Sequence, residues 1–203
     1  MAVNPICTEI LPKNKKSLKF NIMAKKIAVL VGSLRKESFN RKIANEMIRL
    51  ADGKLDMEIV EIGNLQLYSE DLDQNPPQEW TDFRQKIKEA DGILIVSPEY
   101  NRTIPGALKN AIDVGSRPYG SSVWQGKPGA VVTSSISSLG GLAANHHIRQ
   151  AFVFVDVPLM QQPEAYIGNA SEIFREDGKT LVADTETFLK DYMDAFVNWT
   201  QKF

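Results

Sequence analysis

The sequence predicts an α/β domain built on an open parallel sheet with helices on both faces. Short apolar runs typical of strands alternate with segments of helical periodicity along most of the chain. Such alternation supplies the crossover helices that parallel strands require. The chain has 203 residues, 43% of them hydrophobic, and a formal net charge of −1. We therefore expect one domain that buries a substantial core.

The first half of the chain predicts three strands and two helices. An apolar run at 27–31 is the first strand, and a helix-patterned segment follows at 41–50. A second strand is expected at 57–62. A second helix is expected at 80–89, where large apolar residues recur at helical spacing. The unbroken apolar run 92–96 predicts a strand that is covered on both faces.

The second half continues the same alternation. A third helix is expected at 107–114, with Pro105 compatible with its first turn. A fourth strand follows at 129–133, a fourth helix at 143–152 and a fifth strand at 156–160 or slightly beyond. A closing helix is expected to carry on its apolar side Phe188, Leu189, Tyr192, Met193, Phe196 and Trp199.

Residues 1–23 differ from the rest of the chain. They contain several lysines and no sustained periodicity, so we expect a disordered extension before a single domain at 24–203. The single cysteine, Cys7, cannot form an internal disulfide. No apolar run reaches the roughly 18 residues that span a bilayer, and the near-neutral charge offers no field for nucleic acid. We expect a cytoplasmic protein without membrane insertion or nucleic-acid partners.

The polar turn from Gly32 to Asn40 is the first candidate binding loop. It joins a strand to a helix start, whose free N–H groups and positive dipole end attract a phosphate. Arg35 can bind two phosphate oxygens at once. An ordinary turn in which Ser38 caps the helix explains the same residues equally well. Neither a dinucleotide fingerprint nor a Walker loop is present, so a compact ligand is expected.

Two further polar loops follow predicted strands, at 97–102 and 134–141. The first carries Tyr100, which offers a flat apolar face, and Asn101, which offers a donor and an acceptor. The second is rich in serine and ends in two glycines, which allow backbone to approach a flat ligand closely. Because the carboxyl ends of parallel strands meet at one sheet edge, the three loops predict a site for a mononucleotide-like ligand.

Taken together, these loops resemble those of the NADPH-dependent FMN reductase family of flavodoxin-like proteins, and particularly the bacterial quinone and chromate reductases. The matching stretches are 32–36 with 38–40, 97–101, 105–113, 126–128 and 133–135, followed by Gly140, Gly141, Ile148 and Arg149. They cover most of the chain from Lys25 to about Glu164, in the order and spacing of the family.

The resemblance implies a flavodoxin-like sheet of strand order 2-1-3-4-5 that binds FMN non-covalently. By the match, Ser33, Arg35, Ser38, Phe39 and Asn40 hold the phosphate. Lining the isoalloxazine and ribityl chain are Glu99, Tyr100, Asn101 and Arg102, and Ser135 contacts the flavin from the third loop. Glu37 departs from the family, which usually has a small residue there, so this carboxylate is expected to point to solvent.

The resemblance further implies an NAD(P)H-dependent oxidoreductase that passes hydride through FMN to quinones or other electrophilic acceptors, such as chromate, azo compounds or free flavin. NADPH or NADH is the expected co-substrate, and ping-pong kinetics are expected. We nominate no catalytic acid or base and no metal site. The family is typically dimeric or tetrameric. A flavodoxin-type electron carrier and a non-catalytic FMN-binding module remain the alternative readings, because one fold hosts many functions.

Overall fold

Five parallel strands form the central sheet of the computed structural model, in the order β2-β1-β3-β4-β5. The structure describes residues 24–203, so the extension expected at 1–23 lies outside the described residues. The strands are β1 (Lys25–Val31), β2 (Leu55–Ile59), β3 (Gly92–Pro98), β4 (Gly129–Ser134) and β5 (Ala165–Ile167). The predicted flavodoxin-like fold and strand order are confirmed.

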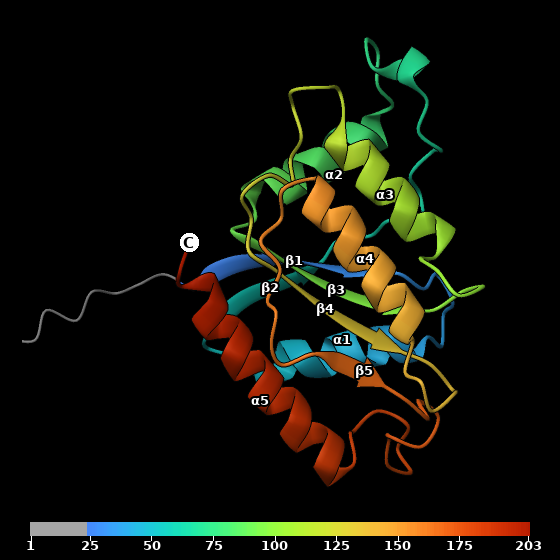
Figure 1. The fold of residues 1–203 in the computed structure, drawn as a ribbon, viewed down its shortest axis with the longest axis vertical. Coiled ribbons are helices and arrows are strands. Elements are labelled where there is room, and N and C mark those ends of the chain that lie inside the picture. The colour runs from blue at the N-terminus through green and yellow to red at the C-terminus, as the bar shows by residue number, and fades with distance from the viewer. Residues whose placement is uncertain (1–23) are drawn as a thin grey trace, which may run out of the picture.

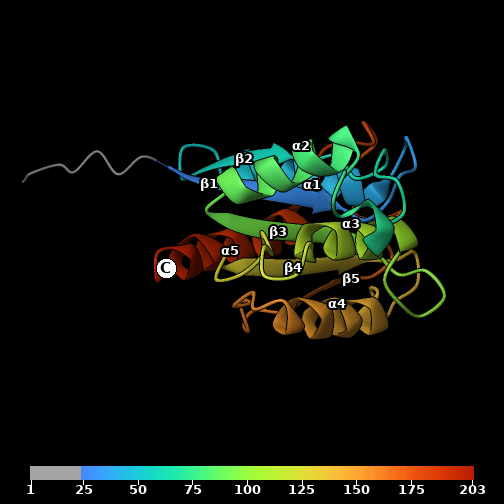
Figure 2. The ribbon, with the colours of Figure 1, turned by 90° about the horizontal axis from the view of Figure 1, so that it is seen from above.

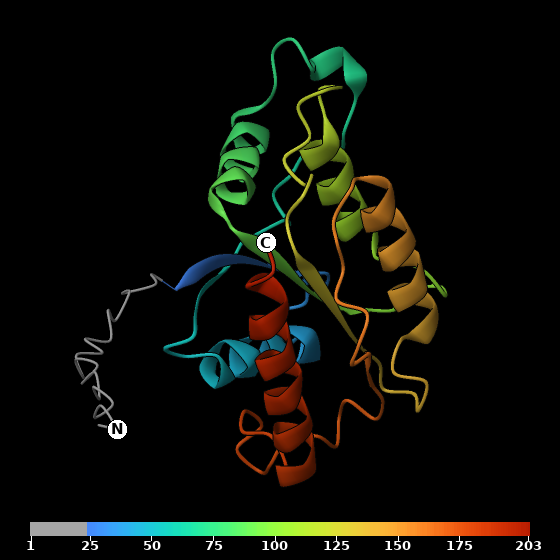
Figure 3. The ribbon, with the colours of Figure 1, turned by 60° about the vertical axis from the view of Figure 1, so that its left-hand side comes forward.

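Helices cover both faces of this sheet, as Figures 1 and 2 show. The helices α1 (Phe39–Leu50) and α5 (Ala183–Thr200) lie on one face. The opposite face carries α2 (Gln78–Glu89), α3 (Gly106–Ser116) and α4 (Leu142–Phe154). A short 3-10 helix at Glu70–Leu72 precedes α2. Figure 3 shows α1 and α5 side by side, away from the other three helices.

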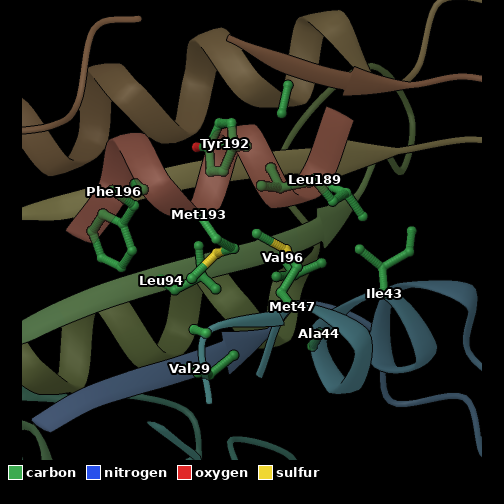
Figure 4. Close-up of a cluster of buried hydrophobic side chains, with 14 of the residues drawn as sticks. Val29, Ile43, Ala44, Met47, Leu94, Val96, Leu189, Tyr192, Met193 and Phe196 are labelled. Carbon is green, nitrogen blue, oxygen red and sulfur yellow. The ribbon is translucent and has the colours of Figure 1, made fainter. Parts of the chain in front are cut away.

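The alternation of side chains along β1 divides the core into two clusters. Val29 faces α1 and α5, whereas Leu30 faces the other helices, and both are fully buried. Figure 4 shows the first cluster, in which Met47 of α1 and Met193 of α5 approach side chains of β3. Both faces of β3 are buried throughout its length, as its unbroken apolar sequence predicts.

The fifth strand was predicted in the wrong place. It lies at Ala165–Ile167 rather than at 156–160. The predicted segment runs beside the start of β4 through a single bridge between Leu159 and Gly129. Asp156 is left-handed (φ 62°), and Pro158 has no N–H to donate, so a continuous ladder cannot form there. The apolar residues of this segment are buried without forming a strand.

The packing of α3 against Trp124 generates a stability prediction. A Cβ at Gly115 would lie 2.5 Å from the indole ring, which is fully buried. Gly115→Ala should therefore lower the free energy of unfolding by about 1–3 kcal/mol through overpacking, although alanine is the better helix former.

Gly106, at the start of the same helix, is the matched control because no atom lies within 4 Å of its hypothetical Cβ. Gly106→Ala should leave stability unchanged or raise it by up to about 1 kcal/mol. Urea denaturation of both variants measures this, and equal stabilities would contradict the packing argument.

Candidate functional site

The three predicted loops meet at one edge of the sheet, around a cavity of about 320 Å³. They leave the carboxyl ends of β1, β3 and β4, which are neighbours in the sheet. Of the ten residues predicted for the site, eight line this cavity: Ser33, Arg35, Ser38, Phe39, Asn40, Glu99, Tyr100 and Ser135. Asn101 and Arg102 do not line it.

The first loop crosses the end of β3 at close range. The Gly32 N–H donates to the carbonyl of Val96 at 3.0 Å. A Cβ at this position would lie 2.3 Å from the Ser97 hydroxyl oxygen, so glycine is required by close approach. Ser38 is the N-cap of α1, and its hydroxyl accepts from the Arg41 N–H at 3.3 Å. The capping explanation of this loop therefore holds, and it leaves the loop free to bind an anion as well.

Positive charge and free donors gather where this loop enters α1. The first N–H groups of a helix, here those of Phe39 and Asn40, have no acceptor within the helix. The Arg35 guanidinium donates to the Glu37 carbonyl at 2.5 Å and lies 5.2 Å from the centre of the Phe39 ring. The Glu37 side chain is 82% exposed and pairs with Lys42 at 3.7 Å, as the expectation that it points to solvent requires.

The second loop folds back on itself beyond Tyr100. Tyr100 and Thr103 exchange two backbone hydrogen bonds, of 3.1 and 3.0 Å, around a tight turn. The two residues at its tip, Asn101 and Arg102, are both left-handed, with φ of 51° and 62°. Their place at the tip explains why they do not line the cavity. The Tyr100 hydroxyl lies 3.5 Å from the Ser33 hydroxyl and links the second loop to the first.

The fold requires both glycines of the third loop. Gly140 and Gly141 are left-handed, with φ of 59° and 79°. A Cβ at Gly140 would lie 2.5 Å from the backbone of Tyr166 in β5, and one at Gly141 would lie 3.0 Å from Thr133. These close approaches tie the loop to β4 and β5. That the loop backbone also approaches a flat ligand stays a prediction.

Sequence reasoning missed part of the cavity wall. Ala170, from the segment after β5, and Ile136 and Ser134, from the third loop region, also line the cavity. The Ser134 hydroxyl donates to the Asn40 side-chain oxygen at 3.0 Å, and both residues are buried. This bond joins the ends of β4 and α1. The two polar residues are visible in the sequence, one at the end of a predicted strand and the other before a predicted helix. Their pairing follows only from the strand order.

The donor set suits a phosphate group better than a metal ion. No cluster of three or more histidine, cysteine, aspartate or glutamate side chains that could hold a metal occurs among residues 24–203. His146 stacks on Tyr166 and His147 contacts Thr103, so the adjacent histidines point to different partners. Hydroxyls, helix N–H groups and Arg35 instead converge on the cavity, and these are phosphate donors.

No helix within residues 24–203 has the length and apolar character needed to cross a membrane.

Comparison with known proteins gives consistent matches. Residues 25–172 match the family described as NADPH-dependent FMN reductase. A quinone reductase of Pseudomonas putida is 53% identical over 176 residues, which cover 86% of this chain and 94% of that protein. A 2-hydroxy-1,4-benzoquinone reductase of Burkholderia sp is 45% identical over 179 residues, covering 88% of this chain and 98% of that protein.

Among solved structures, the chain is similar to FerB, a flavoenzyme NAD(P)H:(acceptor) oxidoreductase from Paracoccus denitrificans. The two share 39% sequence identity with a TM-score of 0.83, and the match covers 88% of this chain and 98% of that one.

Proposed function

The chain belongs to the NADPH-dependent FMN reductase family, and from this premise we propose an NAD(P)H-dependent, FMN-containing reductase that acts on quinones. The observation that carries the proposal is the convergence of the three predicted loops on one cavity with a phosphate donor set at one end. When bound, FMN supplies the hydride chemistry between nicotinamide and acceptor, and the protein supplies binding and orientation.

The first loop is the phosphate subsite of this proposal. Arg35 and the free N–H groups at the start of α1 provide charge, and the hydroxyls of Ser33 and Ser38 provide further donors. Asn40 contributes through its side-chain amide, because its oxygen is already bonded to Ser134. Phe39 forms the wall of this subsite.

The second and third loops are the proposed subsite for the isoalloxazine and ribityl chain. Tyr100, which is 47% exposed, offers its ring to a flat ligand. Glu99 and Ser135 line the same space, and we assign Asn101 and Arg102 to the outer part of the flavin, from the turn that follows Tyr100. We nominate no catalytic acid or base. In this proposal nicotinamide and acceptor use the bound flavin in turn, with ping-pong kinetics and tolerance of acceptors such as chromate, azo compounds and free flavin.

Anaerobic mixing with NADPH tests the proposed function. The purified protein should be yellow, should release FMN on denaturation, and should lose its visible flavin band when NADPH or NADH is added. Addition of 1,4-benzoquinone should restore the band. A flavin band that persists with both nicotinamides would indicate an electron carrier, and a colourless protein that takes up no FMN would indicate a non-catalytic module.

Arg35→Ala tests the phosphate subsite. Loss of a charge-assisted hydrogen bond of about 1.5–3 kcal/mol should weaken FMN binding roughly ten- to a hundredfold. Riboflavin lacks the phosphate, so its weaker binding should change little. Titration of both flavins into apo-protein measures this.

Lys36→Ala is the matched control, because Lys36 is an exposed cation of the same loop that does not line the cavity. If Arg35 only holds the turn through the Glu37 carbonyl, both flavins should weaken in parallel and the apo-protein should melt earlier.

We also propose that the protein forms a homodimer or a homotetramer. A groove of about 520 Å³ lies between α3 and α4, and its lining includes Arg117 and Phe154. Phe154, Val153 and Tyr119 are 89%, 67% and 93% exposed. Figure 1 shows α3 and α4 side by side on the same face of the sheet. Large apolar side chains exposed beside such a groove favour a protein contact, and a second copy agrees with the family resemblance.

Phe154→Glu should dissociate the oligomer, because it places a charge in the groove of the proposed contact. Phe203→Glu is the control, since Phe203 is also exposed but lies at the carboxyl terminus. Light scattering at micromolar concentration should give a smaller mass for the first variant only. A monomeric wild-type protein with full activity would refute the proposed assembly.

A further inference from the structure

Both carboxylate oxygens of Glu99 are engaged by the protein itself. One oxygen accepts from the backbone N–H of Ala144 at 3.2 Å, and the other accepts from the Arg102 guanidinium at 3.3 Å. The side chain is only 12% exposed, whereas that of Arg102 is 74% exposed. Glu99 therefore points toward the start of α4, although it follows directly on β3.

The start of α4 lacks a capping side chain of its own. Its N-cap is Gly141, which makes no side-chain hydrogen bond, and no acidic residue stands in its first turn. A helix start presents free N–H groups and the positive end of the dipole, both of which favour a carboxylate. Glu99 supplies that carboxylate from 45 residues away in the sequence. It is thus a helix cap provided by a neighbouring loop.

A second contact binds the far end of the same loop to the same helix. The Nδ1 atom of His147 lies 2.8 Å from the Thr103 hydroxyl. Ala144 and His147 are three positions apart and share one side of α4. The loop is therefore attached to α4 on both sides of Tyr100, once through Glu99 and once through Thr103.

The turn between these attachments is conformationally unfavourable. Asn101 and Arg102 are both left-handed, which costs energy for residues other than glycine. Such conformations persist where the surrounding structure over-determines them. The two attachments to α4 provide that constraint, and they hold the segment that carries Tyr100.

We propose that Glu99 is a positioning residue that holds the second loop in place by capping α4, rather than a direct ligand of the flavin. The inference rests on the proposed function for its consequence in FMN binding, but the cap itself is a property of the chain without cofactor. Tyr100 and the backbone beside it carry the effect to the cavity. To cap α4, the side chain at Glu99 must accept a hydrogen bond, and its full negative charge is of secondary importance.

Three variants separate these roles. Glu99→Ala removes the acceptor, Glu99→Gln keeps an acceptor without the charge, and Asp191→Ala removes an exposed carboxylate on α5 as the control for net charge. In the protein without cofactor, hydrogen exchange of the Ala144 amide should accelerate roughly tenfold or more in Glu99→Ala. It should stay within about threefold of wild type in the other two.

FMN titration and turnover complete the test. Glu99→Ala should weaken FMN binding roughly tenfold, by loss of the ordered loop, and should change the visible circular dichroism of bound FMN. Its kcat with NADPH and 1,4-benzoquinone should fall at saturating FMN, and Glu99→Gln should restore most of each value.

Three contrary outcomes overturn the inference, each in a distinct way. Unchanged exchange at Ala144 in Glu99→Ala would disprove the cap whether or not the protein is a reductase. Faster exchange with unchanged FMN affinity and circular dichroism would reduce Glu99 to a stability element. A Glu99→Gln variant that behaves like Glu99→Ala would show that charge, and not the acceptor, is what matters. Failure of the wild-type protein to bind FMN would count against the proposed function alone.

Discussion

The close approach of the first loop to the end of β3 is the constraint on which the site depends. The order of the strands reverses between β1 and β3, so the chain leaves β1 toward one face of the sheet and β3 toward the other. A crevice opens between two such loops. Gly32 lets the first loop remain against Ser97, because any side chain there would meet the serine hydroxyl. With a larger residue the loop would rise, and Arg35 and the start of α1 would move away from Tyr100.

A group of polar bonds around Asn145 attaches α4 to β4 and to the segment that leads to β5. Asn145 of α4 donates to the Thr133 hydroxyl at 3.3 Å and accepts from Arg149 at 2.8 Å. Arg149 also donates to the Met160 carbonyl at 2.9 Å, and so holds the segment that leads to β5. Buried polar groups are costly unless paired, so the pairing of Asn145 with Thr133 and Arg149 favours one position of α4 on β4. They also give a structural reason for Arg149 as part of the family pattern.

The sequence predicts the strands of the sheet correctly where they are long and apolar. It fails where residues are buried without pairing in a strand. The run at 92–96 is covered on both faces and lies within β3. Val157 and Leu159 are equally buried but lie in irregular backbone, whereas the true β5 has only three residues. Apolar pattern reports burial, and it does not report which backbone groups pair. The second strand begins and ends earlier than predicted for the same reason. Exposed residues alternate with less exposed ones along it, so its apolar pattern does not mark its bounds.

For the site, the sequence predicts where the loops lie but not which hydrogen-bond partners their side chains take. That the three loops share one edge followed from β/α alternation alone, and eight of the ten nominated residues line the cavity. Which partner each polar side chain takes did not follow from the sequence. The side-chain oxygens of Asn40 and Glu99 accept hydrogen bonds from Ser134 and Ala144, which are far away along the chain. A polar residue at a strand end therefore predicts proximity to a ligand better than contact with it.

The segment between β5 and α5 supports the first loop and so helps to preorganise the proposed site. Phe174 stacks on Phe39 with ring centres 6.2 Å apart, and Lys42 lies 5.8 Å from the Phe174 ring. Arg35 covers Phe39 in turn, so aromatic contacts support the first loop from outside the cavity. Orientation is what a protein contributes when a cofactor carries the chemistry. Here the first loop is supported by Phe174 and the second loop by α4, so both parts of the proposed site are held by elements that follow them in the chain.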